Sequence, residues 1–245
     1  MTKALMARLD RLLANLGYGS RRDVQALVSS GKVTLDGAPL KDAGQKIAVT
    51  ADLPLRMKIR GVAVDPPAPL VLILHKPLGV VCSHREDGER IYDLLPKRWQ
   101  LRDPALSSVG RLDKDTSGLL LITDDGDYLH RVISPRRHVP KTYLATLDRP
   151  LTGREAALFA SGELMLEGED KPLLPAELAV IDETHARLTI TEGRYHQVRR
   201  MFAAVGNHVN ALHRERIGGL ILPEDLEPGQ YRILSADQAE GVFDV

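Results

Sequence analysis

Cysteine is nearly absent from this chain, and its absence excludes two classes of protein. Only Cys82 occurs among the 245 residues, so the chain can form neither a disulfide framework nor a cysteine-rich zinc site. The spacings of His196, His208 and His213 match no zinc signature, and no cysteine lies beside them. We therefore predict no metal, and we expect the protein to work in a reducing compartment, the cytoplasm.

Long apolar runs are missing as well. No segment approaches the roughly 20 apolar residues that a transmembrane helix needs, and residues 1–5 lack the apolar stretch of a secretory signal. The sequence contains no internal repeat and no low-complexity tract. We expect a globular protein with no membrane role.

Net charge is also missing, because 33 Lys and Arg balance 33 Asp and Glu. The balance hides an asymmetry: residues 1–60 hold 11 basic and 5 acidic residues, a net charge of +6, and the remainder holds 22 and 28, a net charge of −6. A basic block on an acidic body suggests that the first part attracts a polyanion such as nucleic acid. Judged by charge alone, a solvated surface would be the simpler interpretation.

Three prolines, at positions 66, 67 and 69, mark a boundary between two patterned regions. Such a cluster cannot lie inside a helix or a central strand. We predict a first domain over residues 1–60, a linker over 61–69 and a second domain over 70–245.

The first domain is predicted to contain two short helices and a hairpin. Apolar spacing, a capping box and a turn dipeptide indicate them in that order: a helix over residues 8–16, a helix that Ser20 and Asp23 begin and Gly31 ends, and a strand over 32–35 that runs into Asp36-Gly37.

The second domain mixes strands and helices without the regular alternation of a doubly wound sheet. Apolar runs predict a buried strand over 70–74 and a strand over 119–123 that an Asp124-Asp125-Gly126 turn ends. A capping box of Thr152 and Glu155 predicts a helix that Gly162 ends, and Gly206 closes a second predicted helix over 197–205. Alternation at Ala186, Leu188 and Ile190 predicts a further strand. The pattern favours an α+β fold on a largely antiparallel or mixed sheet.

Three sequence blocks of the first domain carry a resemblance. They are Arg8-Leu9-Asp10-Arg11-Leu12-Leu13, Ser20-Arg21-Arg22 and Gly31-Lys32-Val33-Thr34-Leu35-Asp36-Gly37. They resemble the signature of the S4 RNA-binding module, a small α/β domain, and the resemblance implies RNA contacts by five residues, Arg8, Arg11, Arg21, Arg22 and Lys32. Arginines at a helix start oppose the helix dipole, so phosphate binding supplies a reason for Arg21 and Arg22, although an exposed helix start would also tolerate them.

The run from Gly110 to Leu121 places a charged cluster between glycines, immediately before an apolar strand. Loops held by a buried strand often present reactive side chains. Taken alone, the Arg111-Leu112-Asp113 sequence is more often a local ion pair than a catalytic centre.

Further blocks along the chain change that interpretation. The blocks are Gly110-Arg111-Leu112-Asp113-Lys114-Asp115-Thr116-Ser117-Gly118, Leu74-His75-Lys76-Pro77-Leu78-Gly79, Lys141-Thr142-Tyr143-Leu144, Gly193-Arg194-Tyr195-His196-Gln197-Val198-Arg199-Arg200, and Leu212-His213-Arg214-Glu215-Arg216-Ile217-Gly218-Gly219. The first resembles motif II of the pseudouridine synthases, and together they resemble the RsuA-type branch, which modifies ribosomal RNA. The resemblance implies an isomerase that converts uridine to pseudouridine.

By that resemblance Asp113 is the nucleophile. The reaction breaks the bond from uracil N1 to C1′, turns the base and rejoins it through C5. A carboxylate can assist by attacking the sugar or by drawing off a sugar proton toward a glycal, and the sequence does not choose between these routes. The chemistry needs no metal and no other cofactor.

Two further residues are implied to be catalytic. Arg199 is the expected charge partner that favours the ionised Asp113 carboxylate in a site closed to water; otherwise it is a solvated helix arginine, a role that suits Arg200 better. Tyr143 is expected to lie against the flipped uracil; otherwise it packs in the core with a wet hydroxyl.

The remaining expected contacts with the substrate come from six side chains. They are Arg111, Arg136, Lys141 and Arg194 as phosphate or loop-ordering contacts, and His196 and Gln197 in the block shared with Arg199.

The residues around His196 and the run from Leu212 to Arg216 resemble the small-subunit ribosomal RNA enzymes most closely. The expected partner is ribosomal RNA or an assembly intermediate of a ribosomal subunit, and the enzyme is expected to be a monomer. Two alternatives stay open: a large-subunit RNA target, and an RNA-binding assembly factor without catalysis.

Overall fold

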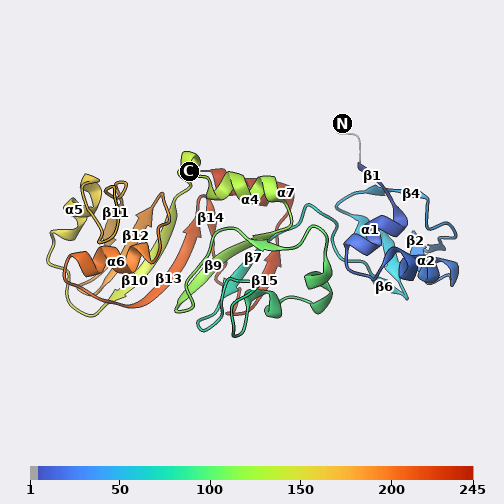
Figure 1. Cartoon of the computed structure of the whole chain (residues 1–245), viewed down its shortest axis with the longest axis horizontal. Helices are drawn as coiled ribbons and strands as arrows, with labels where there is room; N and C mark the ends of the chain where they lie inside the picture. Colours follow the sequence, from blue (N-terminus) through green and yellow to red (C-terminus); the bar gives the residue numbers. More distant parts are fainter. Residues whose placement is uncertain (1–4, 245) are drawn as a thin grey trace. The chain divides into compact units, whose positions relative to one another are not determined.

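The structure is a computed structural model that describes residues 5–244, and it divides them into two compact units (Figure 1). The first unit contains residues 5–70, 95–107 and 123–125, and the second contains 71–94, 108–122 and 126–244. The prediction about a secretory signal falls on residues 1–4, which lie outside the described part. In residues 5–244 no helix has the length and apolar character needed to cross a membrane.

The first unit combines short helices with two small sheets. Its elements are β1 (Leu5–Arg8), α1 (Leu9–Asn15), α2 (Arg21–Ser29), β2 (Val33–Leu35), β3 (Ala38–Pro39), β4 (Lys46–Val49), α3 (Leu53–Arg56), β5 (Met57–Ile59), β6 (Val62–Ala63) and η2 (Lys97–Leu101). β1 pairs with β4, and the other sheet has the order β3, β2, β5, β6. The first unit's sheet thus extends to Ala63, into the stretch predicted as a linker.

Local signals specify the helix and turn geometry of this unit. Ser20 accepts a hydrogen bond from the Asp23 N–H and the Asp23 carboxylate accepts one from Ser20, which confirms the predicted capping box of α2. Asp36 and Gly37 have φ angles of 50° and 82°, the left-handed conformations that the predicted hairpin turn requires.

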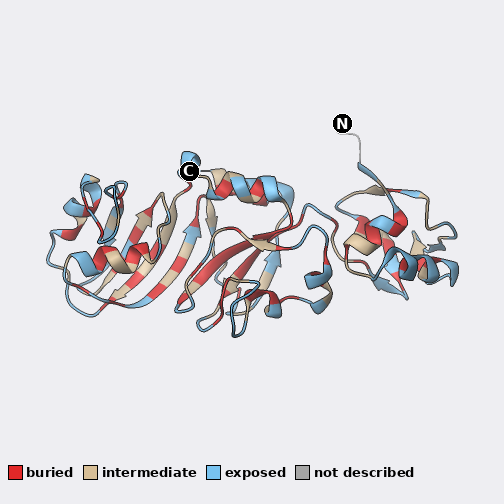
Figure 2. Ribbon diagram, in the orientation of Figure 1, coloured by how far each residue is buried: buried red, intermediate tan, exposed pale blue. Residues whose placement is uncertain are grey.

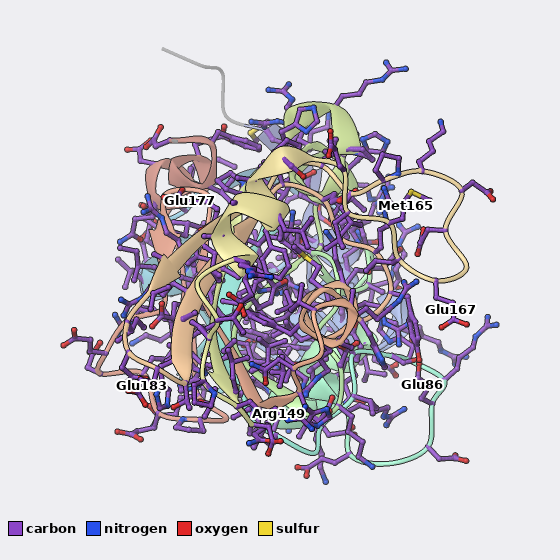
Figure 3. The ribbon with its side chains drawn as sticks, turned by 90° about the vertical axis from the view of Figure 1, so that its left-hand side faces the viewer. Glu86, Arg149, Met165, Glu167, Glu177 and Glu183 are labelled. Carbon is purple, nitrogen blue, oxygen red and sulfur yellow. The ribbon has the colours of Figure 1, made fainter. Side chains whose placement is uncertain are left out.

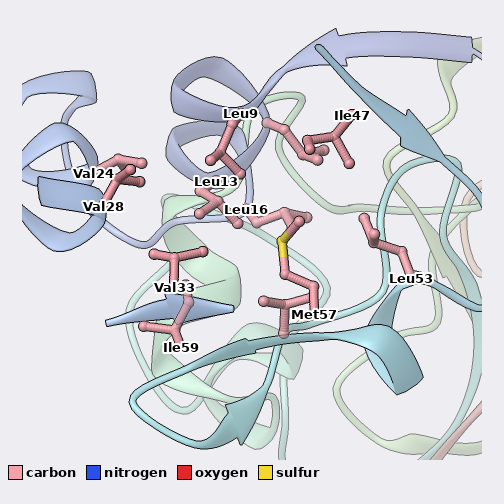
Figure 4. Packing of buried hydrophobic residues seen from close by; sticks show 12 residues of the cluster. Leu9, Leu13, Leu16, Val24, Val28, Val33, Ile47, Leu53, Met57 and Ile59 are labelled. Atoms are coloured by element: carbon pink, nitrogen blue, oxygen red, sulfur yellow. The ribbon is translucent and has the colours of Figure 1, made fainter. Parts of the chain in front are cut away.

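Apolar side chains from the three α-helices and both sheets form one core in the first unit (Figure 4). Leu9 and Leu13 of α1, Val24 of α2, Val33 of β2 and Met57 of β5 are all fully buried. Each is contributed by an element too short to be stable alone, so packing of these faces stabilises the unit.

The second unit is built on one large sheet. Its strands follow the order β11 (Glu177–Val180), β12 (His185–Ile190), β10 (Lys141–Leu147), β13 (Val209–Ile217), β9 (Thr116–Thr123), β7 (Val71–Lys76) and β15 (Tyr231–Ile233), with β14 (Leu220–Ile221) on β13 and β8 (Ser107–Ser108) on β9. β13 and β9 run parallel, whereas the pairs β11–β12, β12–β10, β10–β13 and β15–β7 are antiparallel. The predicted α+β class and mixed sheet are confirmed.

Helices cover the sheet in two groups (Figures 1 and 2). α4 (Gly126–Ile133) and α7 (Ala236–Glu240) lie together, and the Tyr128 hydroxyl donates to the Ala239 carbonyl at 2.9 Å. α5 (Glu155–Ser161) and α6 (Gln197–Ala204) meet through the rings of Phe159 and Phe202, 5.4 Å apart. Short 3₁₀ helices complete the unit: η1 (Ile91–Leu94), η3 (Pro135–Arg137) and η4 (Gly241–Phe243).

One predicted helix start differs from the structure. β9 ends at Thr123, where the strand was predicted to end, and Asp124 and Asp125 lead into α4, whose buried Tyr128 and Val132 lie four residues apart on one face. Thr152 does not cap α5, which begins at Glu155; its hydroxyl and N–H instead donate to the Glu155 carboxylate. Gly162 ends α5 in the left-handed conformation, as predicted.

Candidate active site

Asp113 lies in the loop that leads into β9. The Val109 N–H donates to the Leu121 carbonyl at 2.8 Å, and the Thr116 N–H donates to the Asp113 carbonyl at 3.1 Å. Gly110 has a φ of 75°, a conformation that lets the chain turn before Asp113. Backbone bonds therefore hold the loop, and the Asp113 side chain remains 33% exposed.

A buried cation anchors the same loop from the neighbouring strand. Lys76, at the end of β7, is fully buried, and its Nζ donates to the carbonyls of Thr116 at 2.8 Å and Pro77 at 3.0 Å. Burial lowers the pKa of Lys76, whereas the charges of Asp113 and Asp115 raise it. The sequence pattern predicts no role for Lys76, because lysines are usually exposed.

His196 is the side chain next to Asp113. Its Nε2 lies 3.3 Å from the Asp113 Oδ1, and the two side chains are 37% and 33% exposed. His196 precedes α6 with a φ of 49°, a costly left-handed conformation for a residue other than glycine. The structure therefore brings a predicted substrate-binding residue next to the predicted nucleophile.

Arg199 occupies a different place from the one expected. Its guanidinium lies 3.1 Å from the Asp115 Oδ2 and donates to the backbone carbonyls of Asp115 at 3.0 Å and Val209 at 2.7 Å. The expected pairing with Asp113 is replaced by one with Asp115, in the same loop, because Val209 and the Asp115 carbonyl already direct the guanidinium there. Arg199 thus ties α6 to the loop that carries Asp113.

Tyr143 is buried in β10 and meets an arginine that the sequence analysis left without a role. The register places Tyr143 beside Arg214 of β13, whose Nη1 donates to the Tyr143 hydroxyl at 3.3 Å. The Arg214 Nε donates to the Leu119 carbonyl of β9 at 2.8 Å, and Arg214 is only 2% exposed. Its position two residues after the apolar Leu212, and therefore on the same face of the strand, is the signal that could have revealed it.

Gly118 explains how β9 and β13 approach each other at Arg214. Gly118 has a φ of 110°, and a Cβ there would lie 2.3 Å from the Arg214 carbonyl oxygen. Any side chain would therefore push the two strands apart.

Three other predicted contacts lie in different surroundings. Arg111 is 65% exposed and pairs with Glu86 at 2.7 Å; Figure 3 labels Glu86 on its loop. Lys141 donates to the Val139 carbonyl at 2.9 Å, and burial together with the Arg214 charge lowers its pKa to about 8. Arg136 is exposed in η3.

Arg194 and Gln197 organise the start of α6. The Arg194 guanidinium lies 3.1 Å from both Glu169 and Glu192. The Gln197 side chain accepts from the Arg194 N–H at 2.9 Å and donates to Glu192 at 3.0 Å. Both side chains are engaged within the protein and shape the loop around His196.

His213 faces the other side of the sheet from Arg214, because side chains alternate along β13. Its Nδ1 lies 2.9 Å from the Ser117 Oγ, and burial lowers its pKa. With His75 it lines a cavity of about 610 Å³. Across residues 5–244, no group of three or more His, Cys, Asp or Glu side chains is arranged to hold a metal ion.

In the first unit, the five arginines and lysines predicted to bind RNA are all exposed. Arg8 and Arg21 also clamp the buried Asp10 at 3.1 Å and 2.7 Å. Their hydrogen bonds hold the pKa of Asp10 well below its usual range. Arg11, Arg22 and Lys32 project into solvent.

Family models match both units. The model described as RNA pseudouridylate synthase matches residues 70–204, and the S4 domain model matches residues 7–53. Relatives named "Ribosomal small subunit pseudouridine synthase A" are similar over nearly the whole chain. The one from Vibrio cholerae is 42% identical over 236 residues, and the one from Escherichia coli K12 is 43% identical over 243 residues; each match covers 96% of this chain and 99% of the relative.

A solved structure is similar in its fold as well as its sequence. The crystal structure of a pseudouridylate synthase matches with a TM-score of 0.67 and 38% identity, covering 96% of this chain and 99% of that one.

Proposed function

Because the chain belongs to the RNA pseudouridylate synthase family and is a pseudouridine synthase, we propose that it isomerises a specific uridine of small-subunit ribosomal RNA. The similarity to two small-subunit enzymes over 96% of the chain carries this proposal. The similarity covers both the catalytic part and the S4 domain. We therefore expect this chain to share the RNA-binding unit of these enzymes and to act on the same class of RNA.

Asp113 is the proposed nucleophile. Its carboxylate is 33% exposed while backbone hydrogen bonds hold its loop, so a substrate can reach an oxygen whose position is already set. The C1′ bond to N1 breaks, the uracil turns, a bond from C1′ to C5 forms, and the proton on C5 moves to N1. No atom is gained or lost overall and no electrons are exchanged with another molecule, and we propose that the reaction proceeds without a cofactor.

Tyr143 and Arg199 complete the proposed catalytic set. The Tyr143 ring stacks against the turned uracil, and the hydrogen bond from Arg214 fixes its hydroxyl. Arg199 neutralises Asp115 and keeps the loop in place beside the reacting sugar.

The S4 domain is the proposed RNA-binding part of the enzyme. Arg11, Arg22 and Lys32 are exposed on its surface, where cations attract phosphates regardless of sequence. We propose that the enzyme acts as a monomer in the cytoplasm, where the buried thiol of Cys82 stays reduced. Arg111 and Arg136, both exposed, are proposed phosphate contacts.

Mapping of pseudouridine in ribosomal RNA tests the proposal. RNA is compared from cells with the gene, cells without it, and cells that carry the Asp113→Asn variant. We expect one small-subunit pseudouridine to disappear in the latter two strains. Loss of a large-subunit site would reassign the target, and no lost site would leave only an RNA-binding assembly factor.

A further inference from the structure

Tyr195 is the most exposed aromatic side chain near Asp113. Its exposed fraction is 76%, although removing an aromatic ring from water lowers the free energy. It immediately precedes His196, whose ring lies beside the Asp113 carboxylate. A large ring left in water beside a reactive carboxylate suggests that a ligand covers it.

One face of the Tyr195 ring is already covered. The Tyr195 and His196 rings lie 3.9 Å apart with an angle of 16° between their planes, a stacked arrangement. The opposite face accounts for the high exposure. Tyr195, His196 and Asp113 therefore lie in a row. The Tyr195 ring stacks on the His196 ring, and the His196 ring contacts the Asp113 carboxylate.

The segment that carries Tyr195 is held rigidly. The Arg200 Nη1 donates to the Tyr195 carbonyl at 3.1 Å and to Glu169 at 2.8 Å. Arg194 also binds Glu169, at 3.1 Å, from the other side. Glu169 belongs to the long loop after α5 that Figure 3 marks with Met165 and Glu167. A ring held in place loses little entropy when a ligand stacks on it.

The surrounding charges select the class of ligand. Arg194, Arg199 and Arg200 are the arginines nearest in sequence, and all three are paired: Arg194 and Arg200 with glutamates, and Arg199 with Asp115. The site thus offers no free cation of its own block to a phosphate. An open aromatic face without a free charge suits a neutral, flat group, and a nucleobase is such a group in RNA.

We propose that Tyr195 is a stacking platform for an unpaired nucleobase that flanks the target uridine. The inference rests on the proposed function, because it assumes an RNA substrate whose target uridine reaches Asp113. Bases in RNA loops are unstacked and readily pack on protein aromatic rings. The platform would position the RNA strand next to the turned uridine and so contribute to the choice of target.

An internal role is the competing explanation. Tyr195 could act only by supporting the His196 ring, and so affect Asp113 without touching RNA. The two roles predict different kinetic effects. Stacking on a flanking base changes KM and RNA affinity, whereas support of His196 changes kcat, its pH profile, or both.

The test uses the full-length enzyme and short synthetic RNAs built around the uridine that pseudouridine mapping identifies. RNA affinity and single-turnover rates are measured for the wild type, Tyr195→Phe and Tyr195→Leu. Leucine keeps an apolar side chain but removes the aromatic face. Ile221→Ala is the matched control, since Ile221 is 63% exposed in β14.

We expect Tyr195→Leu to weaken RNA binding by about tenfold, the size typical of one lost base stack, and Tyr195→Phe and Ile221→Ala to match the wild type. Replacing one flanking nucleotide by an abasic unit should weaken binding to the wild type by a similar factor. The same replacement should have little further effect on Tyr195→Leu, because both changes remove the same stacking interaction.

Several outcomes would overturn the inference. The first is an RNA affinity of Tyr195→Leu equal to that of the wild type. The second is an abasic unit that weakens RNA binding by the same factor in the wild type and in Tyr195→Leu. The third is a change in Tyr195→Leu that is confined to kcat. If mapping finds no target uridine, the proposed function fails instead. The two failures are therefore distinguishable.

Discussion

The tripeptide Arg-Leu-Asp occurs once in each unit, and the two copies have opposite surroundings. In the first unit Asp10 is fully buried. Its carboxylate accepts hydrogen bonds from Arg8 at 3.1 Å, from Arg21 at 2.7 Å and from the backbone N–H of Arg11 at 2.8 Å. Every route by which a substrate could reach this carboxylate is closed.

In the second unit the same three residues diverge. Arg111 turns away from its own aspartate and pairs with Glu86 at 2.7 Å. The Asp113 carboxylate is 33% exposed and lies 3.3 Å from the His196 ring. A carboxylate whose acceptor sites are filled stabilises structure, whereas one that keeps free acceptor sites can bind or attack a substrate.

The largest expected effect comes from Asp113→Asn. The amide keeps the shape of the side chain but is a poor nucleophile, so we expect the isomerisation rate to fall by about 10⁴-fold or more. RNA affinity should stay within about twofold of the wild type, since a solvent-exposed charge contributes little free energy. Single-turnover release of tritium from RNA labelled at uridine C5 measures the rate. Appreciable turnover would show that another residue is the nucleophile.

Asp10→Asn is the matching change in the other copy. We expect it to lower the free energy of unfolding by about 1–3 kcal/mol, because a neutral amide cannot satisfy two arginines, while kcat stays unchanged. Denaturant unfolding followed by circular dichroism measures this loss.

The pH dependence of that loss identifies its origin. The pKa of Asp10 is depressed in the folded chain, so the stabilisation is fully present above the unfolded pKa of about 3.9 and is lost as the pH falls through the lower folded pKa. The difference between the wild type and Asp10→Asn should therefore shrink below about pH 4. A difference that stays constant with pH would contradict a charge-based role.

Charge reversal in the first unit tests its proposed role in RNA binding. The triple change Arg11→Glu, Arg22→Glu and Lys32→Glu alters exposed side chains, so folding should be unaffected. RNA binding should weaken by about tenfold or more. The slope of the logarithm of the binding constant against the logarithm of the salt concentration should become shallower by about two, because binding without these three phosphate contacts releases fewer counterions. Binding titrations from low to high salt give the slope. An unchanged slope would remove the phosphate-binding role.

Glu86→Gln has the smallest expected effect. It releases Arg111, whose pair with Glu86 is exposed and therefore weak. We expect stability to stay within about 0.5 kcal/mol and RNA affinity to rise by about twofold, because a free guanidinium becomes available to phosphate. Weaker binding in this variant would mean that the Glu86 pair orders Arg111 for RNA instead.

Much of the local structure could be predicted from neighbouring residues. The capping box of Ser20 and Asp23, the Asp36-Gly37 turn and the alternation along β12 are confirmed. In each case the interacting residues lie within four positions of one another, so the pattern itself contains both partners. The Thr152 and Glu155 pattern failed because Glu155 binds Thr152 without a reciprocal cap.

The site was only partly predictable, because its cations are unusual. Lys76 and Arg214 are both at most 2% exposed, where composition favours apolar residues. Backbone carbonyls compensate them: Thr116 and Pro77 for Lys76, and Leu119 for Arg214. Such carbonyls leave no mark in the sequence, since every residue has one.

The sequence by itself determined the elements, the charge asymmetry and the blocks that mark Asp113, because these depend on residues close together in the chain. Only the tertiary structure decided which Arg-Leu-Asp carboxylate is filled and which stays open. It also decided that Arg199 binds Asp115, across 84 positions of the chain. Ion pairs and carbonyl contacts over such separations form wherever packing brings the groups together, and packing is a property of the whole fold.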